Sequence, residues 1–338
     1  MQLNIYDFDM KLKYPFSISR HTYYSQPNII LELQYDGLSG YGEATTNPYY
    51  NITIENLKES FDAMNKRLKD YNFHSPNQLF DDFSDFLSVN SFALGALNNA
   101  SWDLFGKLKG CPVSRLIDMP KLAHPQTSYT LGIDTKKVML KKMEDLPWPI
   151  YKIKLGTPND LDLIKFIRKH SKSMIRVDAN CAWDFEQTID LSRELKALNV
   201  EFIEQPLAAE DHFQKQCYQG SLLPLIADES CCTESDVERC KNHFHGINIK
   251  LLKCGGLSPA LRMIKKGRKL GLKIMVGCMT ESSIGISAAA QLLPFVDYAD
   301  LDGPLILAED LATGLKYENG NLSLSKEVGF GISFKRPS

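Results

Sequence analysis

Three acidic residues and three lysines recur at regular intervals through the second half of the sequence. The carboxylates are Asp178, Glu204 and Asp228, and the lysines are Lys152, Lys154 and Lys250. Each stands toward the end of a short β-rich run. Carboxylates that are brought together repel one another unless a cation neutralises them. Because every ligand atom they offer is an oxygen, they favour a hard ion, Mg²⁺ before Mn²⁺ or Ca²⁺.

The elements that carry these residues form a repeating pattern. From about residue 125, β-rich runs alternate with stretches of helical spacing. There are eight such runs: 128–133, 150–156, 174–180, 201–206, 225–230, 246–251, 272–278 and 297–303. Eight β/α units predict a (β/α)₈-type barrel, in which functional residues gather where the strands end. The three carboxylates lie on the third, fourth and fifth strands, so we expect them to converge.

The lysines extend this hypothesis. Lys152 and Lys154 are two residues apart, so they lie on the same side of the second strand. Lys154 and Lys250 belong to the second and sixth strands, which are four apart in a ring of eight, and should face each other across the barrel mouth. Two amines on opposite faces of one carbon can remove a proton from one side and return it from the other. A cation nearby would stabilise the enolate that forms.

The rest of the chain predicts a second, smaller domain. Strand-like segments at 2–9, 28–35 and 41–44 precede a helical block at 53–108, which is typical of an α+β domain. We expect residues 1–122 to form a capping domain and residues 123–310 to form the barrel. The polar, Gly-rich segment 311–338 is expected to return and pack on the capping domain.

Several motifs carry a resemblance to a known family. In the barrel they are YKIKLG, RVDAN, EFIEQP, ADES and NIKLLKCGGL, and before it they are GYGEAT (40–45) and NASWDLFGKLKG (99–110). With these motifs the chain resembles the enolase superfamily, and within it the muconate-lactonizing-like subgroup. The resemblance implies that Asp178, Glu204 and Asp228 bind Mg²⁺. It also implies that Lys154 and Lys250 are the two acid/base lysines and that Lys152 assists them.

Other positions bear on the substrate that the resemblance implies. Asp300 and Asp302 look like the Asp-x-Asp motif of dipeptide epimerases, which holds the α-ammonium of the substrate. Two carboxylates away from the metal do form a cation site. Thr130 matches a threonine near the bound dipeptide. Arg20, in the segment FSISRHTYYSQ (16–26), which we read as a loop, matches an arginine that approaches the side-chain carboxylate of the substrate in Ala–Glu epimerases.

The function expected from this resemblance is Mg²⁺-dependent epimerisation of an L-Ala-Xaa dipeptide at its C-terminal residue, with L-Ala-D/L-Glu as the leading substrate. An N-acylamino acid racemase and an o-succinylbenzoate synthase remain alternatives, because they share the lysines and the metal. A non-catalytic barrel that binds a carboxylate is a further alternative, although binding needs no opposed bases. A Schiff-base aldolase would leave the three carboxylates unexplained.

The composition of the chain argues against two classes of binding partner, nucleic acid and membrane. Lys and Arg number 39 and Asp and Glu number 41, a net charge of −2, which argues against binding to nucleic acid. No apolar run approaches the length of a membrane span, and the first residues lack the pattern of a secretory signal. The eight cysteines include no C-x-x-C pair. We therefore expect a cytoplasmic enzyme with a small-molecule dipeptide substrate, and leave a homo-oligomer open.

Overall fold

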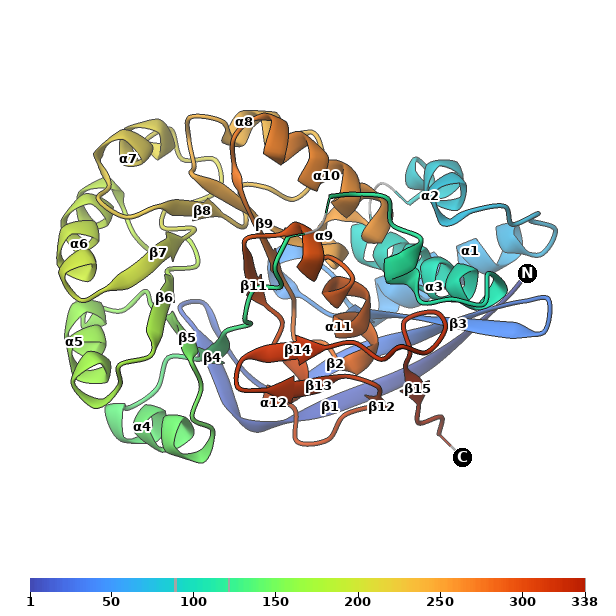
Figure 1. Cartoon of the computed structure of the whole chain (residues 1–338), viewed down its shortest axis with the longest axis horizontal. Helices are drawn as coiled ribbons and strands as arrows, with labels where there is room; N and C mark the ends of the chain where they lie inside the picture. The colour runs from blue at the N-terminus through green and yellow to red at the C-terminus, as the bar shows by residue number, and fades with distance from the viewer. Residues whose placement is uncertain (88–89, 121, 338) are drawn as a thin grey trace.

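The chain folds as a ring of parallel strands with an antiparallel sheet and three helices at one side (Figure 1). This computed structural model describes residues 1–87, 90–120 and 122–337. The antiparallel part contains β1 (Gln2–Ile18), β2 (His21–Tyr35), β3 (Leu38–Thr45), α1 (Ile54–Leu68), α2 (Pro76–Ser84) and α3 (Ser91–Leu108). Its strands pair in the order β1-β2-β3.

The hairpin of β1 and β2 differs from the expected loop over residues 16–26. Both strands continue past an irregularity between Lys11 and Phe16 and pair as far as Ile18 with His21. Only Ser19 and Arg20 form the turn. The prediction of a loop was therefore wrong: the β-branched and aromatic residues here have a partner strand that satisfies their backbone groups. A long, paired hairpin holds Arg20 at its tip.

The barrel contains the eight expected strands. They are β4 (Tyr129–Leu131), β5 (Ile150–Lys154), β6 (Met174–Asp178), β7 (Val200–Glu204), β8 (Leu225–Ala227), β9 (Gly246–Lys250), β10 (Lys273–Gly277) and β11 (Tyr298–Asp300). Neighbours along the chain are neighbours in the sheet, and all pairs are parallel. A parallel bridge joins Thr127, just before β4, to Ala299 of β11 and so brings the two edges of the sheet together. The fold is a nearly closed (β/α)-type barrel, as predicted.

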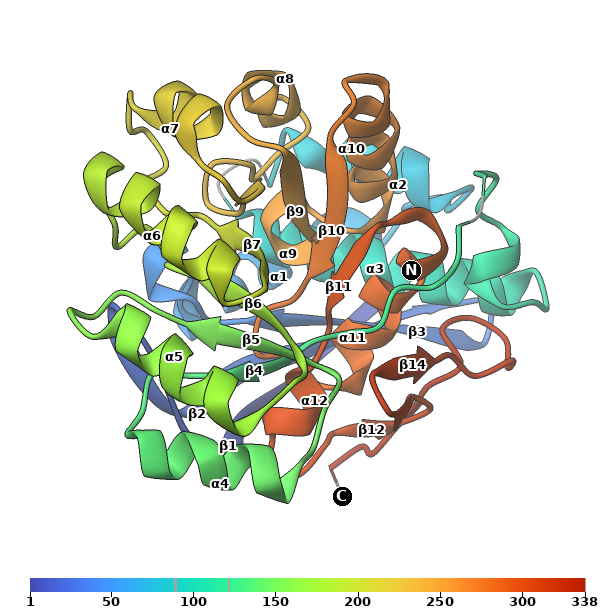
Figure 2. The same ribbon diagram turned by 60° about the vertical axis from the view of Figure 1, so that its left-hand side comes forward.

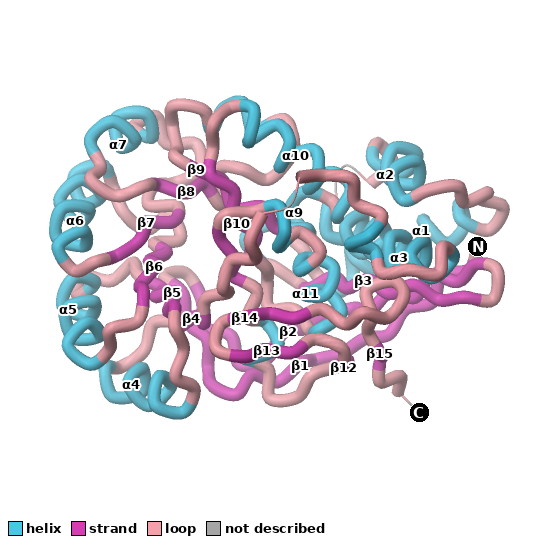
Figure 3. The backbone as a smooth tube through the Cα atoms, in the orientation of Figure 1, coloured by secondary structure: helices cyan, strands magenta, loops and turns pink. Residues whose placement is uncertain are grey.

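Helices cover the outside of the ring (Figures 1 and 3). They are α4 (Lys136–Asp145), α5 (Asp160–His170), α6 (Phe185–Ala197), α7 (Gln214–Gly220), α8 (Asp236–Cys240), α9 (Leu251–Cys254), α10 (Leu257–Lys269), α11 (Ser283–Ala290) and α12 (Gly303–Ile306). The eighth strand is followed only by the four-residue α12, where the expected unit would carry a long helix. Within the described ranges, no helix is long and apolar enough to cross a membrane.

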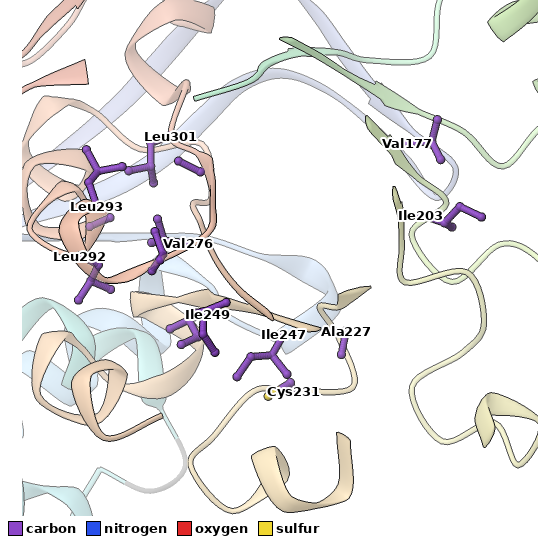
Figure 4. Packing of buried hydrophobic residues seen from close by; sticks show 14 of the residues in the cluster. Val177, Ile203, Ala227, Cys231, Ile247, Ile249, Val276, Leu292, Leu293 and Leu301 are labelled. Carbon is purple, nitrogen blue, oxygen red and sulfur yellow. The ribbon is translucent and has the colours of Figure 1, made fainter. Parts of the chain in front are cut away.

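Alternation along the strands separates the core from the chemistry. Ile247 and Ile249 of β9 and Val276 of the neighbouring β10 belong to one hydrophobic cluster, which also includes Val177 on the other side of the ring (Figure 4). Lys250, next to Ile249, instead lines a cavity at the barrel mouth. Successive residues of a strand point to opposite sides, so each strand can seal the core and still deliver a polar side chain inward.

The antiparallel part is fixed to the barrel by a buried carboxylate. Glu43 of β3 accepts hydrogen bonds from the backbone amides of Ser282 (2.9 Å) and Gly285 (3.0 Å) and from the Ser282 hydroxyl (2.6 Å). These groups belong to the N-terminus of α11, where a carboxylate satisfies amides that the helix leaves unpaired. Beside it, a Cβ on Gly42 would lie 2.0 Å from the Ala96 oxygen, so only glycine lets β3 approach α3.

Residues after α12 run back along the antiparallel sheet, and Figure 2 shows them beside β3 and α11. This segment contains β12 (Ala312–Thr313), β13 (Lys316–Glu318), β14 (Asn321–Ser323) and β15 (Ser333–Phe334). The Phe334 ring packs against Tyr6 and Tyr41, and Arg336 pairs with Glu32. The Asp103 carboxylate binds the backbone amides of Tyr41 (3.0 Å) and Phe330 (2.7 Å). The domain boundaries at 122/123 and 310/311 stay predictions.

Candidate active site

A cavity of about 350 Å³ lies at the carboxyl ends of the barrel strands. The tip of the β1–β2 hairpin contributes Arg20 to its wall, and the barrel contributes Lys154 and Lys250. Thr130, Asp300 and Asp302 also line it. The structure therefore brings the predicted catalytic and substrate residues to a single cavity, on strands that start at distant points of the sequence.

The acidic triad is reached from this cavity through Asp228, the member of the triad that lines it. Asp178 ends β6, Glu204 ends β7 and Asp228 directly follows β8, and all three are buried. One carboxylate oxygen from each lies within 4.8 Å of the others. The strand register explains this convergence, because Asp178 is paired with Glu204 across neighbouring strands. Inward-facing carboxylates at the same level of adjacent barrel strands converge on the barrel axis.

The charge of the triad is only partly balanced by the protein. Asn248 Nδ2 donates to Glu204 Oε1 at 2.7 Å, whereas Glu204 Oε2 makes no well-aligned hydrogen bond among the described residues and faces only the Lys152 ammonium, which it shares with Asp178 and Asp300. Burial, together with the nearby Asp178, raises the pKa of Glu204 to about 7. A buried, under-compensated carboxylate in an all-oxygen set is the environment that a divalent cation stabilises. The residues present therefore fit Mg²⁺.

Lys152 lies at the centre of the acidic groups. Its Nζ is 2.8 Å from Glu204 Oε2, 3.1 Å from Asp178 Oδ2 and 2.7 Å from Asp300 Oδ2. The side chain is 1% exposed. Burial opposes its charge, but the surrounding carboxylates outweigh burial and hold the pKa of Lys152 well above its ordinary value. Lys152 is therefore a fixed positive charge, and because three carboxylates share it, none is fully neutralised.

Lys154 and Lys250 approach the triad from opposite sides. Lys154 Nζ lies 2.6 Å from Asp178 Oδ2, and Lys250 Nζ lies 2.7 Å from Asp228 Oδ2. Their strands, β5 and β9, are four positions apart in the sheet, as the sequence predicted. Both side chains line the cavity. A small molecule held between them would present its two faces to two different amines.

Asp300 and Asp302 are close in sequence but differ in environment. Asp300 accepts from Ser128 Oγ (2.6 Å) through one oxygen and from Lys152 Nζ (2.7 Å) through the other. Burial would raise the pKa of Asp300, but Lys152 outweighs it and lowers the value to about 2. Asp302 accepts a hydrogen bond from the backbone amide of Thr130, at 2.6 Å, on Oδ2. Burial and the neighbouring Asp300 raise the pKa of Asp302 to about 7.

The two residues were predicted to act as a pair toward a substrate ammonium. The two carboxylates differ in their ability to accept a hydrogen bond from a substrate, because both oxygens of Asp300 already have hydrogen-bond donors within the protein. Among the described residues, Oδ1 of Asp302 has none. Asp302 is thus the carboxylate that can take a further donor, and Asp300 orients Lys152 and Thr130.

Arg20 reaches the barrel from the hairpin tip. Its guanidinium donates to Glu229 Oε1 at 2.8 Å and lies 4.3 Å from the centre of the Tyr49 ring. Glu229 directly follows Asp228, and its second oxygen is buried without a hydrogen-bond partner among the described residues. Arg20 lines the cavity as expected, but an internal carboxylate already occupies its guanidinium.

Sequence reasoning missed one buried lysine near the triad. Lys253, in α9, donates to Asp228 Oδ1 at 2.6 Å and to three backbone oxygens, those of Asp228 (2.5 Å), Cys231 (3.0 Å) and Asn248 (3.1 Å). The sequence feature nearest to Lys253 is the glycine pair after LLKC. Gly255, in the left-handed region, ends the short helix α9 that carries this lysine.

The segment after β10 borders the cavity in part. Cys278, Met279 and Thr280 line the cavity. Glu281 is buried behind them, and its carboxylate accepts the amide of Met279 at 2.9 Å. Burial, together with the nearby Glu43, raises the pKa of Glu281 to about 8.

Comparison with known proteins places this site in context. Residues 136–338 match the family model "Enolase C-terminal domain-like", and residues 1–118 match "Mandelate racemase / muconate lactonizing enzyme, N-terminal domain". A protein of Flavobacterium johnsoniae described as an L-Ala-D/L-amino acid epimerase is 48% identical over 98% of this chain and 99% of its own. A Bacteroides thetaiotaomicron protein described as an L-Ala-D/L-Glu epimerase is 37% identical over 98% of this chain and 88% of its own.

Solved structures agree with these matches. The substrate-liganded L-Ala-D/L-Glu epimerase of Bacillus subtilis superposes with a TM-score of 0.93 at 26% identity, covering 98% of both chains. A dipeptide epimerase of Cytophaga hutchinsonii complexed with Mg and D-Ala-L-Val gives a TM-score of 0.94 at 26% identity, covering 99% of this chain and 96% of that one. These findings confirm the resemblance inferred from the sequence motifs: the chain belongs to the enolase-like family of mandelate racemase and muconate lactonizing enzymes.

Proposed function

We propose that this protein is a Mg²⁺-dependent dipeptide epimerase that inverts the α-carbon of the C-terminal residue of an L-Ala-Xaa dipeptide. The observation that carries the proposal is the opposition of Lys154 and Lys250 across one cavity, beside a buried acidic triad. Relatives that align over nearly the whole chain carry descriptions of this activity. Epimerisation needs a base on each face of the carbon, and the barrel supplies one from each side.

The proton transfer follows from the positions of the two amines. Lys154 removes the α-proton from one face of the substrate, and the Lys250 ammonium donates a proton to the other face. The opposite epimer reacts with the roles exchanged. When bound to Asp178, Glu204 and Asp228, Mg²⁺ supplies positive charge to the substrate carboxylate and so acidifies the neighbouring α-proton. Lys152 adds a fixed charge on the same side.

The free end of the dipeptide is assigned to Asp302. An epimerase for a free dipeptide must hold an α-ammonium, and Asp302 Oδ1 faces no other donor among the described residues. An ammonium beside this carboxylate favours its charged form and forms a charge-assisted hydrogen bond. N-acylated amino acids carry no such cation, which is why this carboxylate favours a dipeptide over an acylated substrate.

The side chain of the epimerised residue is a narrower proposal. Glutamate remains our leading prediction, with Arg20 as its partner, because Arg20 reaches the cavity from the hairpin. A substrate carboxylate would have to take the guanidinium from Glu229, to which it is now bound. Neutral side chains would leave that ion pair intact. Ala-Glu and neutral Ala-Xaa substrates therefore compete as predictions, and cytoplasmic location and homo-oligomerisation stay predictions as well.

The proposal is tested by proton exchange in D₂O. The protein is incubated with Mg²⁺ and pooled L-Ala-Xaa dipeptides, and mass spectrometry follows the isotopic composition of each dipeptide. We expect a gain of one deuteron in a subset of dipeptides, and loss of this exchange when EDTA is added. Exchange in none of the dipeptides would refute the function. Exchange that is insensitive to EDTA would refute the metal site.

A further inference from the structure

Asp228 is bound by two lysines that differ in their freedom to move. Lys250 binds Oδ2, and Lys253 binds Oδ1. The Lys250 side chain is 10% exposed and lines the cavity, so its ammonium can leave the carboxylate and still reach solvent or substrate. The Lys253 side chain is 1% exposed and lies outside the cavity lining.

The surroundings of Lys253 keep it in place. Besides Asp228 Oδ1, its ammonium donates to the backbone oxygens of Asp228, Cys231 and Asn248, at 2.5 to 3.1 Å. Removing a buried ammonium from such a set would leave several buried acceptors unsatisfied, which is costly. A cation that enters the triad therefore displaces Lys250 from Oδ2 far more readily than it displaces Lys253 from Oδ1.

The number of oxygens that a carboxylate can offer distinguishes two common cations. Mg²⁺ requires near-octahedral coordination and takes carboxylates through one oxygen while keeping several waters. Ca²⁺ takes six to eight ligands and commonly binds both oxygens of a carboxylate. A carboxylate with one oxygen already committed to a fixed ammonium suits the first ion better than the second.

We propose that Lys253 is a positioning residue that makes the site selective for Mg²⁺ over Ca²⁺, by holding Asp228 Oδ1 and leaving Oδ2 as the one oxygen of this carboxylate that an ion can take. The inference rests on the proposed function, since it requires the triad to be the Mg²⁺ site. It assigns a role to a residue that touches neither the cavity nor the reacting atoms.

The test is the ratio of two binding constants in the absence of substrate. Isothermal titration calorimetry measures Mg²⁺ and Ca²⁺ affinity for the wild-type protein and for Lys253→Met. Loss of the positive charge should strengthen binding of both ions. Release of Asp228 Oδ1 should strengthen Ca²⁺ binding further, moving the Ca²⁺-to-Mg²⁺ affinity ratio by at least about tenfold, the usual effect of a residue that orients a metal ligand.

Lys142→Met is the matched control. Lys142 in α4 is a buried lysine, 5% exposed, that pairs with Asp134 at 3.2 Å. Its replacement should leave the affinity ratio unchanged. An unchanged ratio in Lys253→Met, with both affinities shifted equally, would overturn the selectivity role and leave the Mg²⁺ site standing. A wild-type protein that binds neither ion would overturn the metal site together with this inference.

A second measurement covers the case in which Lys253→Met does not fold. A crystal structure of the wild-type protein grown with Ca²⁺ in place of Mg²⁺ should retain the contact between Lys253 Nζ and Asp228 Oδ1. Both oxygens of Asp228 on the Ca²⁺ ion, with Lys253 displaced, would overturn the proposal without any variant.

Discussion

Two regions of this molecule bury carboxylates, and they hold them by different means. At the barrel mouth, Asp178 and Asp228 are held by lysine side chains. At the seam between β3 and α11, Glu43 is held by backbone amides at a helix N-terminus and by a serine hydroxyl. Backbone donors cannot move without unfolding the helix, whereas the ammonium of Lys154 or Lys250, on a four-carbon chain that borders the cavity, can exchange partners.

This difference separates a carboxylate that fixes the fold from one that can do chemistry. Both kinds are equally inaccessible, so burial does not distinguish them. The mobility of the donor does. If the distinction is correct, changes at the mouth should affect turnover with little loss of stability, and changes at the seam should do the reverse.

The largest expected effect is at the mouth. Lys154→Ala and Lys250→Ala should each lower two-way epimerisation by at least about 1,000-fold, because each removes the base for one face. The base that remains should still exchange the α-proton of one epimer. NMR in D₂O, starting separately from each epimer with Mg²⁺ present, measures both quantities. Full two-way activity in either variant would contradict the two-base mechanism.

The seam should respond in the opposite sense. Glu43→Ala removes the acceptor for two backbone amides, the Ser282 hydroxyl and the side-chain amide of Asn28, and should lower the free energy of unfolding by about 3 kcal/mol. Urea denaturation checks this value. Glu43→Gln retains an acceptor oxygen and should lose less. A Glu43→Ala variant with wild-type stability and impaired turnover would reverse the distinction between the two regions.

Asp302 tests which substrate the mouth recognises. Asp302→Asn keeps the shape of the side chain but removes its charge, and should lower kcat/KM for a free dipeptide by about 100-fold. The N-acetylated form of the same dipeptide carries no ammonium, so its slower turnover should be unaffected. Steady-state kinetics on both substrates give the comparison. Equal losses on the two substrates would show that Asp302 does not bind the ammonium.

The smallest expected effect concerns Glu281, a buried carboxyl close to Glu43 that neither region uses. Its pKa in the folded protein is about 8, above the ordinary value of 4.5, so folding favours the neutral form. This contribution to stability is complete below pH 4.5 and is lost as the pH rises toward 8. Glu281→Gln stays neutral, so its advantage over the wild type should grow by about 2 kcal/mol between pH 6 and pH 8. Urea denaturation at the two pH values checks this, and parallel pH dependences would contradict it.

Much of the barrel could be predicted from the sequence because most of its strands carry two recognisable signals. Each is a short apolar run, and all except β4 and β10 end at or next to a charged residue, such as Asp178 or Lys250, that is rarely found in a core. The regular spacing of those residues then fixes their order around the ring. Periodicity is a local signal, and a barrel of consecutive β/α units depends on local order.

What could not be predicted depends on partners far away in the sequence. Glu43 belongs to a recognised motif, but its role comes from Ser282, which lies 239 residues later. The hairpin that carries Arg20 is a local exception: residues 16–18 pair with residues 21–23 across a two-residue turn, and Ser25 pairs with Lys11 beyond an irregularity in the register. Nothing in the sequence marks Lys253 as buried, because lysine is rarely buried and three of its four acceptors are backbone oxygens, which leave no trace in the sequence.

The pairing of Arg336 with Glu32 joins positions 304 residues apart. During synthesis the β1–β2 hairpin leaves the ribosome first, yet α11 and the segment around Phe330 that hold its sheet in place emerge last. The β1–β2 hairpin, whose tip borders the cavity, therefore cannot reach its final position until nearly the whole chain has been made. Nascent or truncated chains would carry the lysines and carboxylates without a closed pocket. Each molecule would therefore become active only after its synthesis is complete.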